Sequence, residues 1–127
     1  MVKKIRLYEA MPEDSRDIWK WRNDQDTRLM FRTPDFVEWE PHSKWFKLML
    51  KRTDQILLVG CDKQNDKVGM VRFDLKDNNV AEISINLDPN KRGLKISKPL
   101  LTQAIEYGIK LGIKEFIAQI KNKNQAS

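Results

Sequence analysis

The spacing of apolar residues changes along the chain, and these changes predict the order of its secondary-structure elements. Residues 3–8 alternate roughly between polar and apolar side chains, as a short strand does. Two helices are predicted next, over 12–23 and from Glu40-Pro41 onward, because each region opens with proline and acidic residues. Residues 24–38, between these helices, show no clear period and are expected to form a loop.

Each predicted helix has one side that suits burial. In the first helix, the spacing turns Ile18, Trp21 and Arg22 toward the same side. In the second helix, apolar residues form a stripe and lysines lie outside it. The predicted stripe is Trp45, Leu48 and Met49, and the outer lysines are Lys44, Lys47 and Lys51.

In the middle of the chain the apolar residues recur with a period of two, which predicts strands. Three strands are expected at 55–61, 68–75 and 80–87, separated by polar turns. In the last of them, alternate residues share a face of the sheet. One face consists of Ala81, Ile83, Ile85 and Leu87, and the other of Glu82, Ser84 and Asn86.

A helix over 97–111, ending near Gly112, and a strand over 115–121 complete the pattern. The predicted apolar stripe of this helix is Leu101, Ile105 and Ile109, at a spacing of four. The order is therefore β-α-α-β-β-β-α-β, an antiparallel meander followed by a crossover between parallel strands. This order predicts a mixed sheet within a single α+β domain spanning residues 1–127.

Composition narrows the class of protein without choosing a function. A chain of 127 residues that is 40% hydrophobic and 33% charged can bury a core and fold as a globular domain. The net charge of +6 favours a polyanionic partner such as nucleic acid, anionic lipid or a phosphorylated small molecule. The single cysteine excludes an internal disulfide and favours a cytoplasmic location. With one histidine and one cysteine, no metal site is expected; no apolar run is long enough to span a membrane, and no membrane partner is expected.

Basic residues gather where the strand 80–87 gives way to the helix 97–111. They are Lys91, Arg92, Lys95 and Lys98. Because a helix N-terminus already carries positive partial charge, cations there repel one another unless an anion is normally bound. Three interpretations are open: a solvated loop, a phosphate cradle that Gly93 lets the backbone form, or a nucleic-acid patch. The last is disfavoured because no aromatic residue lies between positions 74 and 106.

Three stretches of the chain share motifs with one enzyme family. They are AEISINLDPNKRGLKISKPLL at 81–101, WRND at 21–24 with PHSKWF at 41–46, and KNKNQAS at 121–127. Together with the order of elements, they resemble the GNAT superfamily of N-acetyltransferases, and the resemblance spans essentially the whole chain. It implies a GNAT-like acyl-CoA N-acyltransferase fold, with a mixed, mostly antiparallel sheet flanked by helices. It also implies direct acetyl transfer from acetyl-CoA to a primary amine, and the front half is similar to members that acetylate amino sugars attached to nucleotides.

The resemblance further implies which residues bind acetyl-CoA. In the family a signature between the fourth strand and the next helix grips the pyrophosphate. Arg92 matches it, whereas Lys95 and Ser97 replace two of its small residues, so a looser grip is expected; Ser97 could cap the helix. Backbone groups of the fourth strand would hold the pantetheine arm. Asn124 either orients the cofactor or is a polar residue at the end of the fifth strand without a role in binding. The implied contacts are Ile85, Leu87, Arg92, Gly93, Leu94, Lys95, Ile96, Ser97 and Asn124.

Candidate residues for chemistry follow from what the reaction needs. An alkyl amine with a pKa of about 10 must lose a proton before it can attack a thioester, so a base is expected. Glu82 is the candidate for this base. The alternative is that Glu82 is an exposed carboxylate on a strand and has no catalytic role. Arg22, Asn23 and His42 are the candidate acceptor contacts: Arg22 suits a nucleotide-sugar phosphate, and His42 is either a surface residue or a substrate contact.

Other residues that could carry chemistry are expected to serve structure. Cys61 ends an apolar strand and is predicted to be a buried thiol rather than a nucleophile. The tryptophans are predicted to anchor the core and the loops. They are Trp19, Trp21, Trp39 and Trp45.

The C-terminal end departs from the family pattern. Relatives usually continue from the fifth strand into a further helix and hairpin, whereas this chain stops at Ser127, which predicts a truncated domain without the family's tyrosine proton donor. A strand at 115–121 without neighbours leaves an unpaired edge, so a homo-oligomer formed by dimerisation or strand exchange is a hypothesis. Two alternatives to the enzyme are kept: a catalytically weak CoA-binding or oligomerising domain, and a basic nucleic-acid-binding module.

Overall fold

The computed structural model describes residues 5–24, 36–91 and 96–118, which form a five-stranded sheet and three α-helices. The strands are β1 (Arg6–Glu9), β2 (Gln55–Cys61), β3 (Lys67–Leu75), β4 (Val80–Leu87) and β5 (Glu115–Ala118). The helices are α1 (Ser15–Arg22), α3 (Trp39–Lys51) and α4 (Ser97–Lys110), with short 3₁₀ turns at Pro12–Asp14, Asp77–Asn79 and Pro89–Lys91. In these ranges no helix has the length and apolar character that crossing a membrane requires.

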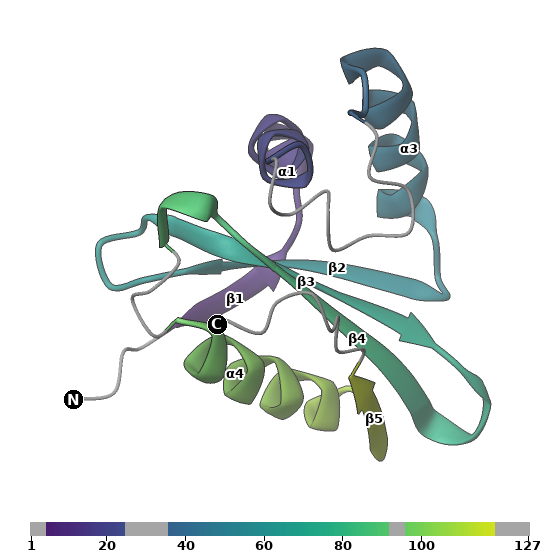
Figure 1. The fold of residues 1–127 in the computed structure, drawn as a ribbon. Coiled ribbons are helices and arrows are strands. Elements are labelled where there is room, and N and C mark those ends of the chain that lie inside the picture. The colour runs from purple at the N-terminus through teal and green to yellow at the C-terminus, as the bar shows by residue number, and fades with distance from the viewer. Residues whose placement is uncertain (1–4, 25–35, 92–95, 119–127) are drawn as a thin grey trace.

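The sheet is mixed, as the order of elements predicts. Its strands lie in the order β1-β2-β3-β4-β5. The first four form an antiparallel meander, and α4 carries the chain over the sheet so that β5 pairs parallel to β4. Figure 1 shows α1 and α3 on one face of the sheet and α4 on the other.

Each face of the sheet has its own apolar core, because successive strand residues point to opposite faces. The core beneath α4 consists of Ile5, Leu58, Val68, Val71, Phe73, Ala81, Ile83, Ile96, Leu100, Ala104 and Ile113. The core beneath α1 and α3 consists of Ala10, Ile18, Trp21, Phe46, Met49, Leu57, Val59 and Met70. The sheet thus separates two packed layers, and adjacent strand residues such as Met70 and Val71 belong to opposite layers.

The predicted stripe of α3 is wrong in one position. The helix buries His42, Phe46 and Met49, whereas Leu48 is 64% exposed. Residues four and three apart from Phe46 share its side of the helix, and Leu48 falls outside that arc. Leu48 was predicted to be buried because it is hydrophobic, but the geometry of the helix places His42 on the buried side instead.

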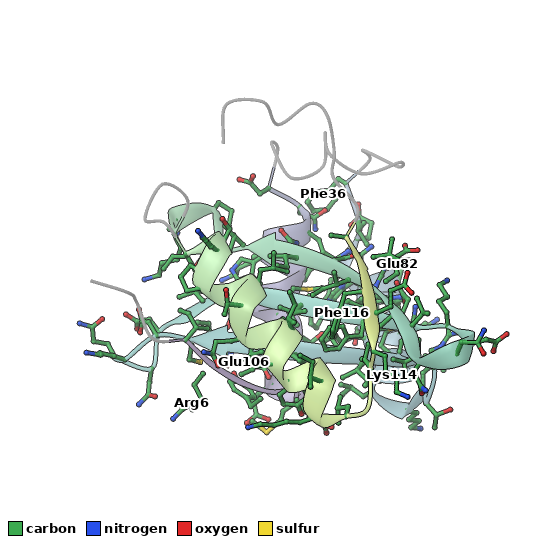
Figure 2. All side chains as sticks on the ribbon, turned by 90° about the horizontal axis from the view of Figure 1, so that it is seen from below. Arg6, Phe36, Glu82, Glu106, Lys114 and Phe116 are labelled. Atoms are coloured by element: carbon green, nitrogen blue, oxygen red, sulfur yellow. The ribbon has the colours of Figure 1, made fainter. Side chains whose placement is uncertain are left out.

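The predicted stripe of α4 is displaced by one residue. The buried residues are Leu100, Ala104 and Gly108, whereas Ile109 is 58% exposed. The reason is close packing on the sheet: a Cβ atom placed on Gly108 would lie 2.6 Å from Cε1 of Phe116. Figure 2 shows Phe116 on β5 beside α4. The small residues Ala104 and Gly108 therefore let α4 lie close to the sheet, and Leu100 fills the core nearer the start of the helix.

One end of α4 agrees with the sequence prediction and the other does not. Gly112 closes α4 with a φ of 98°, a left-handed conformation that glycine adopts readily. Ser97 is not the cap, because Ile96 holds that position and no side chain caps the helix. The expected strand residues 3–4 and 119–121, and most of the expected loop 24–38, lie outside the described residues.

A buried carboxylate fastens α1 to the sheet. Asp14 is 1% exposed and accepts hydrogen bonds from the Met11 amide at 2.8 Å and the Tyr8 hydroxyl at 3.1 Å. Lys67 Nζ lies 2.6 Å from Asp14 and 2.9 Å from Asp17. Burial lowers the pKa of Lys67, but its hydrogen bonds to both carboxylates outweigh that effect and raise the pKa overall. The group ties β1, α1 and β3 together.

Replacing the buried member of this group is expected to destabilise the fold. Asp14→Ala should lower the free energy of unfolding by about 3 kcal/mol, because a buried ion pair loses its partner and a helix start loses its acceptor. Asp17→Ala is the matched control: its side chain is 44% exposed, and it should cost less than about 1 kcal/mol. Urea unfolding measures both variants. Equal losses for the two would contradict the buried role of Asp14.

Candidate functional site

Next to the core beneath α1 and α3, the same face of the sheet becomes polar. Five side chains form this surface, called here the polar face: Arg72, Asp74, Glu82, Ser84 and Asn86. They share a face with Met70 because Met70 pairs with Asn86, Arg72 with Ser84, and Asp74 with Glu82. Polar residues on a half-covered sheet surface, beside a helix pair, make the polar face the candidate site.

Glu82 lies where three strands meet. It pairs with Asp74 of β3 on one side and with Ile117 of β5 on the other, and it is half-buried. Figure 2 labels Glu82 near β5. The side chain of Asp74 is 14% exposed. It accepts a hydrogen bond from Gln55 and forms an ion pair with Arg72 at 3.3 Å. The sequence-based prediction that Glu82 faces away from Ile83 is confirmed, since Ile83 belongs to the core beneath α4.

Beyond Glu82, β4 has one edge that no described strand covers. Parallel pairing with β5 runs from Val80 to Ile83, whereas residues 84–87 pair with β3 and with no described residue of β5. An uncovered strand edge presents N–H and C=O groups to which an extended ligand can hydrogen-bond. The side chains of Ile85 and Leu87 pack against the core beneath α4, so only their backbone could serve a ligand here.

The structure describes part of the predicted phosphate-binding turn. Lys91 ends a 3₁₀ turn after β4, Ile96 is buried at the start of α4, and Ser97 is exposed in its first turn. The remaining predicted cofactor contacts lie outside the described residues. They are Arg92, Gly93, Leu94, Lys95 and Asn124.

Arg22 and His42 are brought together between α1 and α3. Arg22 Nη1 lies 3.1 Å from His42 Nδ1, and His42 Nε2 lies 3.0 Å from the Ser15 carbonyl oxygen. Because a guanidinium can only donate, Nδ1 accepts and the ring proton resides on Nε2, which donates to Ser15. The Arg22 guanidinium also stacks over the Trp45 ring at 4.6 Å. These contacts fix the position of Arg22.

His42 is not a surface residue, so that alternative is wrong. It is 0% exposed and lies 5.7 Å from Trp39, 5.6 Å from Trp45 and 5.9 Å from Phe46, measured between ring centres. Burial lowers its pKa to about 4, assisted by the charge of Arg22 and opposed by the hydrogen bond to Ser15. His42 is therefore neutral at neutral pH and able to accept from Arg22.

Arg22 itself lies in an environment that disfavours its charge. Burial lowers its pKa, and the nearby charge of Arg72 lowers it further. Two guanidinium groups from different elements, α1 and β3, are thus near enough for their charges to interact. Their charges are balanced by those of Asp74 and Glu82 on the polar face, but their N–H groups add hydrogen-bond donors to it.

Asn23 holds the chain entering α3. Its amide donates to the Val37 carbonyl at 2.9 Å and accepts from the Val37 amide at 2.7 Å. Trp19 Nε1 also donates to the Val37 carbonyl, at 2.7 Å. Asn23 has a structural role in the described structure, and its contact with an acceptor stays a prediction.

The tryptophans and the cysteine behave as expected. Trp21 is buried in the core beneath α1 and α3, and Trp19 meets Trp39 edge-to-face at 5.3 Å between ring centres. Cys61 is a buried free thiol. These residues are confirmed as parts of the core and of the loop anchors.

Sequence analysis did not single out Arg72 or Asp74. A signal was present, because both interrupt an otherwise apolar strand at alternate positions. It could not be used without knowing that these positions face Glu82 and Ser84.

Two other features of the structure do not add to this site. A hollow of about 450 Å³, lined by Tyr8 and Cys61 among others, lies at β1, at the opposite edge of the sheet from β5. Within the described ranges, no group of three His, Cys, Asp or Glu side chains could hold a metal ion.

Comparison with known proteins agrees with this architecture. A family model described as the Acetyltransferase (GNAT) family matches residues 15–127. Spermidine N-acetyltransferase from Vibrio cholerae, in complex with CoA and spermine, has a TM-score of 0.81 at 17% identity, over 91% of this chain and 70% of that one. A domain from Methanocaldococcus jannaschii has a TM-score of 0.77 at 20% identity, over 92% and 77%. No curated protein sequence shows significant similarity.

A third similar structure indicates the relative lengths. A chimera of the Vibrio cholerae enzyme SpeG and hSSAT has a TM-score of 0.74 at 17% identity, over 84% of this chain. The present chain spans 64% of that protein, which is less than two thirds of its length. At these identities the likeness is one of fold.

The depressed pKa of His42 can be tested directly, because it is the single histidine of the chain. Its ring resonances in an NMR pH titration should shift with a midpoint at about pH 4 instead of the 6.5 of an unperturbed histidine. An unfolded histidine binds its proton at a higher pH, so the stability from neutral His42 is complete above pH 6.5 and is lost as the pH falls toward 4.

A second measurement separates this effect from that of the carboxylates. Over this pH range the free energy of unfolding should fall less steeply in His42→Gln than in the wild type. A ring that titrates near 6.5 would show that His42 is solvated and does not hold Arg22.

Proposed function

Since the chain belongs to the GNAT acetyltransferase family, we propose that it transfers an acetyl group from acetyl-CoA to a primary amine, by direct attack in a ternary complex. The observation that carries this proposal is the position of Glu82, close to the point where parallel pairing of β4 with the described residues of β5 ends. A carboxylate and a row of backbone groups then lie beside each other. These are the parts that amine deprotonation and thioester binding require.

Residues 84–87 of β4, which pair with no described residue of β5, support binding of the pantetheine arm. Backbone groups around Ile85 and Leu87 would hydrogen-bond to its amides and polarise the thioester carbonyl. The start of α4, at Ile96 and Ser97, lies next along the chain and would face the pyrophosphate. In this proposal Arg92, Gly93, Leu94, Lys95 and Asn124 complete the cofactor site, as the family resemblance implies.

Glu82 would act as the base. It accepts a proton from the acceptor ammonium, and the nitrogen lone pair then forms a bond to the thioester carbon. The tetrahedral intermediate loses the extra proton on its nitrogen and collapses with cleavage of the C–S bond, and the departing CoA thiolate takes up a proton. No covalent acyl-enzyme is needed, and the buried thiol of Cys61 takes no part.

The acceptor is proposed to be an amino-sugar nucleotide. The support is the approach of Arg22 and Arg72, because guanidinium groups bind phosphate oxygens well. A polyamine is the second candidate, since a similar structure is a spermidine N-acetyltransferase bound to spermine. Two nearby guanidinium groups disfavour it, because they would repel a polycation.

The other expectations stay proposals. We propose a cytoplasmic location because the chain has a single cysteine.

We also propose a homo-oligomer formed through β5, because this strand lies at the edge of the described sheet. Sedimentation velocity tests the oligomer: a dimer mass that an added charge at the exposed Ile117 converts to a monomer would support it.

Cofactor binding separates the enzyme from the alternatives. Thermal-shift titrations with acetyl-CoA and CoA should raise the melting temperature, whereas single-stranded RNA should not. Release of free thiol with a panel of amines, amino-sugar nucleotides and spermidine included, then distinguishes an active enzyme from a weak CoA-binding domain. Stabilisation by RNA alone would favour the nucleic-acid-binding module.

Removing the carboxylate of Glu82 should slow turnover without weakening cofactor binding. Glu82→Gln is expected to lower kcat by at least about 100-fold, because the amine loses its proton acceptor. The dissociation constant for acetyl-CoA should stay within about twofold, since the backbone edge is unchanged. Glu106→Gln, at an exposed glutamate on α4, is the control and should leave both values unchanged. An unaffected rate in Glu82→Gln would remove Glu82 from the mechanism.

A further inference from the structure

Two buried nitrogen donors on the polar face have no hydrogen-bond partner among the described residues. They are Nε of Arg72 and Nδ2 of Asn86, and Asn86 as a whole is only 7% exposed. A buried donor left without a partner costs about 1–3 kcal/mol. Native proteins rarely keep such groups unless something else satisfies them. Two of them on one surface call for a common cause.

The strand register places both donors on one side of the sheet. Asn86 pairs with Met70 and Arg72 pairs with Ser84, so Arg72 and Asn86 are diagonal neighbours across β3 and β4. Diagonal neighbours on one face have Cα atoms about 7–8 Å apart, which a single ligand group can bridge when it contacts both side chains. Arg72 is partly neutralised, since its Nη2 lies 3.3 Å from Asp74. That contact leaves Nε unused.

Arg22 adds a third donor from the helical side. Its charge is close enough to Arg72 to be disfavoured by it, and no described carboxylate forms an ion pair with it. The neutral ring of His42 and the Trp45 face hold the guanidinium in place without supplying a negative charge. The charges of Arg22 and Arg72 together balance those of Asp74 and Glu82, so what the region holds in excess is N–H donors without acceptors, not positive charge.

We propose that Arg22, Arg72 and Asn86 form a subsite that binds an anionic group, a carboxylate or a phosphate, carried by the amine acceptor. All three offer N–H donors, and an oxyanion has the several acceptor positions that such a set needs. The proposal rests on the acetyl-transfer function above and defines its acceptor class more closely. The acceptor is an amine that also bears a negative charge, not a polycation.

The spacing along β4 limits how far apart the two groups of the acceptor lie. Glu82 and Ser84 are two residues apart on one face, or about 7 Å at 3.3 Å per residue, and Ser84 stands opposite Arg72. An amine beside Glu82 and an anion beside Arg72 would thus be separated by only a few bonds. Small amino acids, aminophosphates and amino-sugar phosphates meet this requirement.

Matched acceptor pairs test the charge preference. Thiol release is measured with 2-aminoethyl phosphate against ethanolamine, with β-alanine against propylamine, and with spermidine. The wild type should use the anionic member with a kcat/KM about 10- to 100-fold higher, the range that charge-assisted hydrogen bonds give. A preference for spermidine or for the neutral amines would overturn the proposal.

Variants locate the preference on these residues. Arg72→Met, Arg22→Met and Asn86→Leu should each reduce the ratio between anionic and neutral acceptors by about tenfold, mainly through KM of the anionic acceptor. Arg52→Met is the matched control, because Arg52 is exposed and paired with Asp54 away from the polar face; its ratio should not change. Circular dichroism confirms that each variant folds. Folded Arg22 and Arg72 variants that keep the full ratio would contradict the subsite.

A binding readout keeps this proposal distinct from the acetyl-transfer function. With CoA present at saturation, inorganic phosphate should raise the melting temperature of the wild type and of Glu82→Gln, but not of Arg72→Met. If phosphate stabilises in this way while no amine is acetylated, the anion subsite stands and the transferase function fails. If anionic and neutral amines are acetylated equally and phosphate has no effect, the function stands and the subsite fails.

Discussion

The division of β4 into two faces is the constraint on which the rest of the structure depends. Its odd-numbered residues must be apolar because α4 covers them, and its even-numbered residues are then presented to the side of α1 and α3. A register slip by one residue would bury Glu82 beneath α4 and expose Ile83. The antiparallel partner on one side and the parallel partner on the other fix this register. The location of the carboxylate is therefore a consequence of packing the core.

Electrostatics on the helical side follow from how the core is built. Phe46 and the tryptophans exclude water from His42, so the imidazole stays neutral, and a neutral imidazole can accept a hydrogen bond from Arg22. A protonated ring could not accept it and would repel the guanidinium. The aromatic cluster thus does more than fill space. It holds the Arg22 guanidinium near enough to Arg72 for their charges to interact, and in the proposed subsite an anionic ligand would offset that repulsion.

Much of the fold could be predicted from the sequence, because the alternation of apolar and polar residues in the strands limits where each strand can begin and end. The limits of β2 and β4 agree with the predicted 55–61 and 80–87, and β3 starts one residue early, at Lys67. The stripes of α3 and α4 were less accurate, because hydrophobicity does not show that Gly108 must approach Phe116. The polar face was harder still. Arg22 meets His42 across twenty positions, and Arg72 meets Ser84 only through strand pairing, so neither relation can be seen in a linear pattern.

The same separation of scaffold and polar face explains why the family does not determine the acceptor. A protein with 17% identity can share this fold and still bind spermine, because the fold requires only that certain positions be apolar. Positions 72 and 74 of β3 and 82, 84 and 86 of β4 belong to neither apolar core and can carry charged or polar side chains. In this chain they carry Arg72 and Asn86, whose unused donors face the same region as Arg22. A cationic acceptor would leave those donors without partners and add repulsion, whereas an anionic one satisfies them. In the proposal made above, the side chains at these few positions, more than the fold, select the substrate.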